Sequence, residues 1–400
     1  MADNDDKRGA LRPQVMVIGA GLAGLSATCE LADAGCKVTL VERKPYVGGR
    51  TYSFRNGPRE EEIDNGQHVF LKCCTYYIDF LKKLGVYQKT HLQPSLRAEF
   101  IDINRGPSSI TSSPLPAPFH MLPSLLLFKH LSLLDKALVL YAATRILLIG
   151  EEGRKSLDHL SFYQWLRSNH QRDKAIRNFW NLLILPTLND DVHSVSANAA
   201  LMVFQEGLFK TRDGGNIGYS RVGLSSLLAQ EASDYIKSRG GEIILGKGVA
   251  SLEIGGGKVT GVRLPDGQVL KADYYVSAVP HHRLPSLLPP SLRDEPSFSR
   301  ASKLKSTPIV NLHIWFDRVV TDVEFAAFLN SDIQWLFNKS KIYGLNSFQG
   351  QYLCISLSGA RKYIDMPKEE LKQRFIAELN RILPVTREAK VEQFTVVRER

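Results

Sequence analysis

The sequence predicts an α/β fold, and three observations near its N-terminus support this. A short apolar run at residues 15–18 is typical of a parallel strand that is buried on both faces. A glycine-rich turn follows at once, and the apolar residues after it are spaced as in a helix. Residues 37–41 form a second β-rich run. Strand, turn, helix and strand within about thirty residues indicate a βαβ unit.

The glycines of this unit predict a Rossmann-type domain that binds a dinucleotide. Gly19 permits the tight turn, Gly21 lets the backbone approach a pyrophosphate, and Gly24 lets the helix lie close to the strand. The helix N-terminus offers N–H groups and partial positive charge to the phosphates. Glu42 ends the second strand and is expected to accept hydrogen bonds from a ribose, which disfavours NADP. The residues expected to bind the cofactor here are Gly19, Gly21, Leu22, Ala23, Gly24 and Glu42.

A second glycine pair follows the acidic residue. Arg43 comes directly after Glu42, and Gly48, Gly49 and Arg50 follow a short spacer. Two glycines allow close approach to a ligand, and a guanidinium offers forked donors to phosphate. This pattern resembles the flavoprotein amine oxidase and phytoene desaturase superfamily. The resemblance implies that the cofactor is FAD and that this segment passes under its pyrophosphate and ribityl chain.

Two segments narrow the resemblance to one group within the superfamily. They are DNGQHVFLKCCTYYIDFLKKLGV at residues 64–86 and PLPAPFHMLPSLL at residues 114–126. Both are similar to the hydroxysqualene dehydroxylases, bacterial flavoproteins of the squalene and hopanoid pathways within that superfamily. By this resemblance Asn65, Gly66, Gln67 and His68 lie beside the flavin ring, and the reaction is reductive loss of the hydroxyl group of hydroxysqualene. The alternatives are a carotenoid desaturase, an amine oxidase, or a non-catalytic flavin-binding remnant.

Residues 107–150 are the most apolar part of the chain. Charged residues interrupt the region, so we expect no transmembrane helix. Ser132 and Asp135 form a capping box that predicts the start of a helix, as do Ser161 and Gln164 further along. A basic, Leu-rich helical region with proline turns is typical of a membrane interface. It would serve equally well as a helical cap over a substrate cavity.

Composition limits the compartment and the partners. The chain has 44% hydrophobic and 23% charged residues, and its net charge is +10. No nucleic-acid-binding module is present, so the charge favours an anionic membrane surface over nucleic acid. The N-terminus has no apolar signal segment, and the five cysteines include no CxxC pair. We therefore expect reduced thiols, no metal site, and a cytoplasmic protein that is peripheral on the inner face of a membrane.

The later segments predict how the domains are divided. A helix at residues 224–236, a hairpin at 250–264 and a buried strand at 273–280 return to the first sheet. The superfamily resemblance implies that the backbone of Val249 pairs with adenine. Strands at 309–316, 351–358 and 391–397, with a helix after Pro367, indicate a second, mixed sheet. We expect an FAD-binding domain at residues 10–90 and 222–295 and a substrate-binding domain at 91–221 and 296–400.

Catalytic residues and the chain end are less well defined by the sequence. Asp190, Asp191 and His193 cluster after an apolar helix and are weak candidates for a general acid, although such clusters are usually solvated loops. Superfamily members continue beyond the position of Arg400 with a Gly-Asp segment and a helix directed at the flavin. The resemblance thus implies a C-terminally truncated member with weakened control of the redox end. The substrate, reductant and oligomeric state stay open.

Overall fold

The computed structural model describes residues 12–58, 60–345 and 350–400, and the chain divides into two compact units. The first unit comprises the described part of Met1–Phe54, with Asp79–Tyr87 and Gly223–Ser306; the second comprises Arg55–Ile78, Gln88–Val222 and Thr307–Arg400. Each unit is therefore assembled from three separate segments. Residues 55–78 belong to the second unit, whereas the expected FAD-binding domain included them; residues 10 and 11 of that domain lie outside the described residues.

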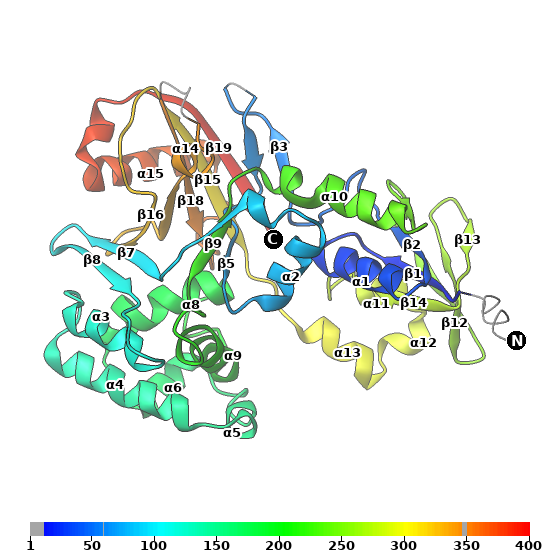
Figure 1. Ribbon diagram of the computed structural model, residues 1–400, viewed down its shortest axis with the longest axis horizontal. Helices are drawn as coiled ribbons and strands as arrows, with labels where there is room; N and C mark the ends of the chain where they lie inside the picture. The colour runs from blue at the N-terminus through cyan, green and yellow to red at the C-terminus, as the bar shows by residue number, and fades with distance from the viewer. Residues whose placement is uncertain (1–11, 59, 346–349) are drawn as a thin grey trace, which may run out of the picture. The chain divides into compact units, whose positions relative to one another are not determined.

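The first unit is built on a four-stranded parallel sheet in the order β10-β2-β1-β14 (Figure 1). Its strands are β1 Gln14–Ile18, β2 Lys37–Val41, β10 Glu242–Ile244 and β14 Tyr274–Ser277. Helix α1 (Leu22–Asp33) contacts α10 (Leu224–Ser238). Met16 and Ile18 pack with Val262 from a three-stranded antiparallel sheet. That sheet contains β11 Ser251–Gly255, β12 Lys258–Arg263 and β13 Val269–Leu270.

The second unit is built on a seven-stranded mixed sheet in the order β19-β15-β18-β17-β16-β7-β8 (Figure 1). Neighbouring strands are antiparallel except that β16 and β7 run parallel. Its strands are β7 Arg97–Asp102, β8 Gly106–Thr111, β15 Ile309–Phe316, β16 Phe325–Leu329, β17 Trp335–Asn338, β18 Gln351–Leu357 and β19 Val391–Glu399. Helix α15 (Lys368–Ile382) buries Leu371, Phe375 and Leu379 in the core of this sheet.

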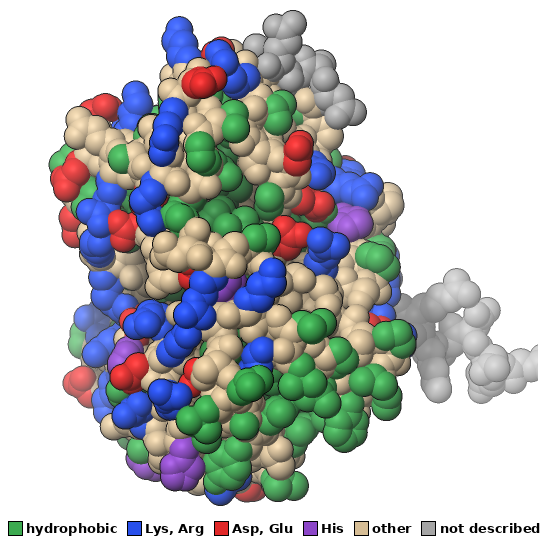
Figure 2. Space-filling view, turned by 90° about the vertical axis from the view of Figure 1, so that its left-hand side faces the viewer, with side chains coloured by type: hydrophobic (Ala, Val, Ile, Leu, Met, Phe, Trp, Pro, Cys, Tyr) green, Lys and Arg blue, Asp and Glu red, His purple; other side chains and the backbone are tan. Residues whose placement is uncertain are grey.

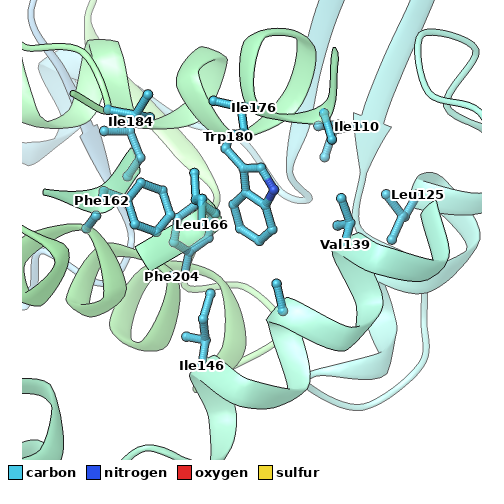
Figure 3. Close-up of a cluster of buried hydrophobic side chains, with 14 of the residues drawn as sticks. Ile110, Leu125, Val139, Ile146, Phe162, Leu166, Ile176, Trp180, Ile184 and Phe204 are labelled. Atoms are coloured by element: carbon cyan, nitrogen blue, oxygen red, sulfur yellow. The ribbon is translucent and has the colours of Figure 1, made fainter. Parts of the chain in front are cut away.

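A helical region of the second unit surrounds a large apolar core (Figure 3). Trp180 is fully buried, and its ring lies edge-on to Phe162 and Phe204. The indole nitrogen donates to Gln171, so the one polar atom of this side chain is satisfied. The helices of this region are η2 Phe119–Met121, α3 Leu122–Leu127, α4 Leu133–Leu148, α5 Glu151–Lys155, α6 Phe162–Ser168, α7 Asp173–Ala175, η3 Ile176–Trp180, α8 Asn181–Leu188, α9 Ala197–Met202 and η4 Val203–Phe209.

Short elements complete the chain. A three-stranded sheet in the second unit contains β5 Val69–Leu71, β6 Thr90–Leu92 and β9 Ile217–Ser220. The other elements are β3 Ser53–Arg55, β4 Glu62–Asp64, α2 Thr75–Lys83, η1 Tyr87–Lys89, α11 Leu284–Leu287, α12 Pro290–Arg293, α13 Pro296–Lys303, α14 Lys339–Ile342 and η5 Pro384–Arg387. No described helix is both long enough and apolar enough to cross a membrane.

Most local predictions are confirmed, with three corrections. The strand expected to be buried at 273–280 is β14, which is partly exposed, with Tyr274 63% exposed. The parallel sheet, the hairpin and both capping boxes form as expected. The region at 107–150 is not wholly helical, because Gly106–Thr111 is the edge strand β8, paired with β7. The segment GPSSIT contains one large apolar side chain, the buried Ile110, so its sequence carries no alternating pattern that would reveal a strand. Pro367 is the N-cap of α15 and not its first helical residue; the helix begins at Lys368.

Candidate functional site

The glycine turn of the first unit has the geometry expected of a nucleotide-binding loop. Gly19 adopts φ +102°, a conformation that favours glycine, and its N–H donates to the carbonyl of Val41. A Cβ built at Gly24 would lie 1.8 Å from the carbonyl oxygen of Gly19, so this glycine is required by the protein itself. A Cβ built at Gly21 meets no protein atom within 4 Å. Glycine at position 21 is therefore not demanded by protein packing, which fits a ligand that approaches this backbone.

Helix α1 begins directly after this turn. Gly21 is its N-cap, no side chain caps it, and its first turn contains no acidic residue. Leu22, Ala23 and Gly24 are its first three residues. Their N–H groups have no partner within the helix and carry the positive end of the helix dipole, so the turn suits a phosphate.

The second glycine pair packs against the first. Gly48 forms a parallel bridge with Gly21, and its N–H donates to the carbonyl of Ala20 at 2.8 Å. Gly49 has φ +64°, and a Cβ there would lie 2.8 Å from the Cα of Gly21. Arg50 follows and is exposed. Two motifs separated by more than twenty residues in sequence are thereby brought to one loop cluster, as expected if they contact the same diphosphate.

Glu42 is buried and held by the backbone. One carboxylate oxygen accepts from the N–H of Ala20 at 2.7 Å, and the other accepts from the N–H of Lys44 at 2.9 Å. Each carboxylate oxygen has further acceptor capacity, so this fixed carboxylate fits the predicted bond from a ribose hydroxyl. Arg43 is exposed beside it.

Val249 lies on the loop that passes this carboxylate. The N–H of Lys247 donates to the carbonyl of Glu42, and a Cβ at Gly248 would lie 3.1 Å from the Cβ of Arg43. The Val249 side chain is buried in the apolar cluster with Met16. Within the described ranges its N–H and carbonyl have no protein partner. Free main-chain groups on a compact apolar residue fit the expected pairing of Val249 with adenine. Together with the glycine turns and Glu42, they show that the first unit fits the nucleotide half of FAD.

The predicted flavin-side segment belongs to the second unit and is anchored by a buried lysine. The Lys339 ammonium donates to Asp64 at 2.9 Å and to Gln67 at 2.8 Å, and lies 3.9 Å from the centroid of the Tyr343 ring. Lys339 and Asp64 side chains are 1% and 2% exposed, and the Tyr343 hydroxyl also donates to Asp64. Burial and the Asp64 charge raise the pKa of Tyr343 well above its usual value. Gln67 is thus held in place, whereas His68 is exposed.

Asn65 and Gly66 pack against Asn311 of β15. The Asn311 amide donates to the carbonyl of Asn65 at 3.0 Å, and a Cβ at Gly66 would lie 2.5 Å from the Asn311 amide nitrogen. The side-chain oxygens of Asn65 and Asn311 are both buried and have no hydrogen-bond partner among the described residues. Buried acceptors without partners are costly, so they fit a site that receives a donor from a bound group such as a flavin N–H.

The three catalytic candidates have contacts typical of structural residues. Asp190 accepts two hydrogen bonds from Arg361, at 2.7 and 2.6 Å, and one from Thr307. Burial opposes ionisation, but these bonds hold the pKa of Asp190 below its usual value. Asp191 accepts from the backbone N–H of His193, and the His193 ring lies on Tyr163. An ion-paired carboxylate with a lowered pKa is a poor proton donor, so this geometry does not support the general-acid hypothesis.

Sequence reasoning missed the buried polar residues of the second unit. Asn311, His313 and Lys339 lie on or beside central strands and carry no motif. Burial lowers the pKa of His313 to about 3, so the imidazole is neutral, with its Nδ1 2.7 Å from the Tyr352 hydroxyl. Polar residues in an otherwise apolar strand were the only signal in the sequence. A surface pocket of about 250 Å³ in the same unit is lined by polar and charged residues such as Ser112, Arg212 and Asp213, and so does not suit an apolar isoprenoid.

The comparisons with known proteins agree with this geometry. Residues 22–399 match the family described as flavin-containing amine oxidoreductase. A probable zeta-carotene desaturase of Synechococcus elongatus is 26% identical, over 96% of this chain and 87% of that protein. A 15-cis-phytoene desaturase of the same organism is 22% identical, over 93% and 80%. The crystal structure of an oxidoreductase from Methanosarcina mazei has a TM-score of 0.72 at 19% identity, over 96% and 87%, which shows a common fold.

Proposed function

The chain belongs to the flavin-containing amine oxidoreductase family, with FAD as its cofactor, and on this premise we propose that its substrate is hydroxysqualene, which it reduces to squalene. The chain is an FAD-dependent oxidoreductase. The proposal for its substrate is carried by residues 64–86, whose sequence is similar to that of the hydroxysqualene dehydroxylases. It is supported by relatives named for long, apolar isoprenoids, which match more than nine-tenths of the chain.

The proposed reaction consumes reducing equivalents. The carbon–oxygen bond of the substrate breaks, a carbon–hydrogen bond forms, and the hydroxyl group leaves as water after it receives a proton. Reduced FAD, when bound, would supply the hydride, that is, the two electrons and the hydrogen of the new carbon–hydrogen bond. The carbon centre becomes electron-deficient as the hydroxyl leaves, so the protein must exclude water from it. Lys339 and Asn311 would hold Gln67, Asn65 and Gly66 where the cofactor ring is expected.

Carotenoid desaturation is the second candidate, because both relatives named above are desaturases. This reaction runs in the opposite redox direction: the polyene loses two hydrogen atoms and oxidised FAD accepts the electrons. The two candidates share a cofactor and an apolar isoprenoid substrate. The direction of electron flow therefore distinguishes them better than substrate binding does.

The test follows the flavin absorbance without oxygen. FAD-loaded protein is reduced photochemically and mixed with hydroxysqualene; in parallel, oxidised protein is mixed with phytoene or zeta-carotene. We expect hydroxysqualene to restore the oxidised spectrum and to yield one squalene for each flavin, while the carotenes leave the oxidised spectrum unchanged. Bleaching by a carotene with formation of a new double bond would overturn the proposal in favour of desaturation. Bound FAD that responds to no isoprenoid or amine would indicate a non-catalytic flavin protein.

We further propose that the second unit delivers this apolar substrate from a membrane surface. Among the described residues, ten of the twenty exposed large hydrophobic side chains lie between residues 115 and 148. Figure 2 shows apolar side chains gathered in the lower part of the view, around α3 and α4. We call this set the apolar cap; it consists of Leu115, Phe119, Leu126, Leu127, Leu133, Leu134, Leu140, Tyr141, Leu147 and Leu148. Exposed Lys129 and Arg145 accompany it, which suits an anionic lipid surface.

A further inference from the structure

Two adjacent cysteines form an exposed turn in the second unit. Cys73 and Cys74 follow β5, and the N–H of Cys74 donates to the carbonyl of Leu71 at 2.9 Å. The carbonyl of Cys74 accepts from the N–H of Ile78, so Cys74 immediately precedes the first turn of α2. Cys73 is half-buried and Cys74 is exposed. Of the other cysteines, Cys29 and Cys354 are fully buried, and both have a raised pKa because of burial.

The two thiols belong to adjacent residues and are chemically unequal. The Cys73 thiol hydrogen-bonds to the Cys74 sulfur, which lowers the pKa of Cys74 to about 6 in spite of partial burial. The same bond, with burial, raises the pKa of Cys73. The Cys73 sulfur lies 4.0 Å from the position of a Cβ on Gly207, the residue of η4 that faces it. The other titratable groups that act on the pair are Glu206 on η4 and Tyr77 on α2. Cys74 is thus the more exposed and the more acidic thiol of the pair, and Cys73 is the neighbour placed to react with it.

We propose that Cys73 and Cys74 form a redox-active dithiol that a hydroperoxide converts reversibly to a disulfide. The Cys74 thiolate attacks the peroxide; the O–O bond breaks, an S–O bond forms, and the alkoxide leaves and takes a proton. Cys73 then attacks the Cys74 sulfenic acid, which forms the S–S bond and releases water. In sum, two thiols and one hydroperoxide give one disulfide, one alcohol and one water.

The position of the pair supports reversibility. A disulfide between neighbouring residues closes a small ring whose geometry departs from that of an ordinary disulfide. Strained and exposed disulfides have more oxidising potentials, and small thiols reduce them easily. The pair therefore suits a switch better than a structural bridge. This inference does not depend on the identity of the isoprenoid substrate.

Intact-mass measurement on the full chain with bound FAD tests the proposal. One equivalent of hydrogen peroxide should reduce the mass by about 2 Da, and dithiothreitol should reverse the change. C73S should instead gain one oxygen at Cys74, trapped by dimedone and located by peptide mapping. C74S should not react at this concentration. C36S is the matched control, because it removes a partly exposed cysteine outside the pair, and it should behave as the wild type.

Two further measurements distinguish a pair of thiols that react together from two independent surface thiols. Phenylarsine oxide should bind once to wild type and C36S and fail to bind C73S and C74S. The alkylation rate of Cys74 by iodoacetamide should rise with a midpoint near pH 6 and shift to higher pH in C73S, which lacks the thiol that stabilises the thiolate. Absence of the mass loss in wild type, its persistence in C74S, or arsenical binding that survives in both serine variants would overturn the proposal.

Discussion

At the scale of single residues, glycines in one motif have different physical requirements. The space at Gly24 is filled by the carbonyl of Gly19, whereas no protein atom lies near the Cβ position of Gly21. Gly21 also has φ −72° and ψ 178°, a conformation that alanine adopts without strain. The protein therefore requires glycine at position 24 for folding, whereas glycine at position 21 serves the close approach of the ligand.

Alanine at these two positions should separate folding from cofactor binding. We expect G24A to destabilise the apoprotein by about 1–3 kcal/mol, because the backbone around Gly19 must move. G21A should melt with the wild-type apoprotein but bind FAD roughly tenfold or more weakly. Thermal unfolding of the apoprotein and FAD titration by fluorescence measure the two effects. An unchanged FAD affinity in G21A would remove this glycine from the proposed site.

Lys339 is a single buried residue that holds the segment at residues 64–67 in place. Its ammonium forms a buried ion pair with the Asp64 carboxylate and also donates to Gln67. K339M should destabilise the protein by about 3–5 kcal/mol, because it leaves a buried charge without its counterion. The double variant D64N/K339M should recover much of this loss, since both charges are removed.

The neighbouring Lys341 provides the matched control for this test. It is exposed on the same short helix, and its ammonium donates to the backbone carbonyl of Asp322. K341M should change stability by less than about 0.5 kcal/mol. Urea denaturation of the four proteins is the measurement. If K339M and K341M were equally stable, the buried ion pair would contribute nothing to the anchoring of the 64–67 segment.

At the scale of elements, Asp33 joins three helices of the first unit. It ends α1 and accepts hydrogen bonds from Lys83 of α2 at 2.7 Å and from Tyr235 of α10 at 2.8 Å. Arg239, just after α10, adds a third partner at 2.5 Å. The bond from Lys83 is the main reason that the pKa of Asp33 falls to about 2. These contacts therefore hold α1, α2 and α10 together by charge as well as by apolar packing.

This lowered pKa predicts a pH-dependent contribution to stability. The folded carboxyl group titrates near pH 2 and the unfolded group near pH 4, so the unfolded state binds the proton first. The contribution is fully present above about pH 4 and is lost as the pH falls towards 2. D33N should cost about 1 kcal/mol at pH 7, because Asp33 is partly exposed and solvent screens the interaction.

Urea unfolding midpoints at several pH values between 7 and 3 measure this contribution. The gap between wild type and D33N should stay constant down to about pH 4 and then narrow. D79N is the control, because Asp79 is exposed and its contact with Lys82 is long, at 3.5 Å. It should show a gap of less than about 0.5 kcal/mol. A D33N gap that widened in acid would contradict the assignment.

At the scale of the whole molecule, net charge and the apolar cap both favour binding to an anionic membrane surface. The chain carries a charge of +10, and α4 has apolar side chains on its exposed side as well as its buried side. A surface of this kind is expected to enter the headgroup region of anionic lipid with help from long-range attraction. The attraction should weaken as salt shortens the Debye length to about 8 Å at physiological ionic strength.

Flotation with phosphatidylglycerol vesicles tests the proposed membrane contact. We expect the wild-type protein to float at low salt and to float less at high salt. The triple variant L127S/L133S/L148S removes three of the most exposed side chains of the apolar cap and should remain at the bottom of the gradient. L304S/V319S/V385S removes three exposed apolar side chains elsewhere and should float as the wild type does. Equal flotation of the two variants would exclude the apolar cap as the contact surface.

The sequence by itself determined the features whose physics is local. Each local feature is set by residues within about thirty positions of one another, so spacing reveals it. These features are the glycine turn, the first two parallel strands, the acidic residue at position 42 and the capping boxes at Ser132 and Ser161. FAD follows from the same local motifs together with the family. The strand β8 was missed because its residues, GPSSIT, carry no period-two apolar pattern, and its pairing with β7 is what defines it.

Only the tertiary structure decided which residues share a site. Lys339 reaches Asp64 across 275 positions and Asn311 reaches Asn65 across 246, and no local pattern encodes such pairings. The interpretation of Asp190 also changed once its partner was known, because Arg361 makes it a structural ion pair. Glu42 kept its predicted role, and the structure adds the two backbone amides that hold it. A buried polar group is stable only when distant segments supply its partners, so its function is defined by packing and not by its neighbours in sequence.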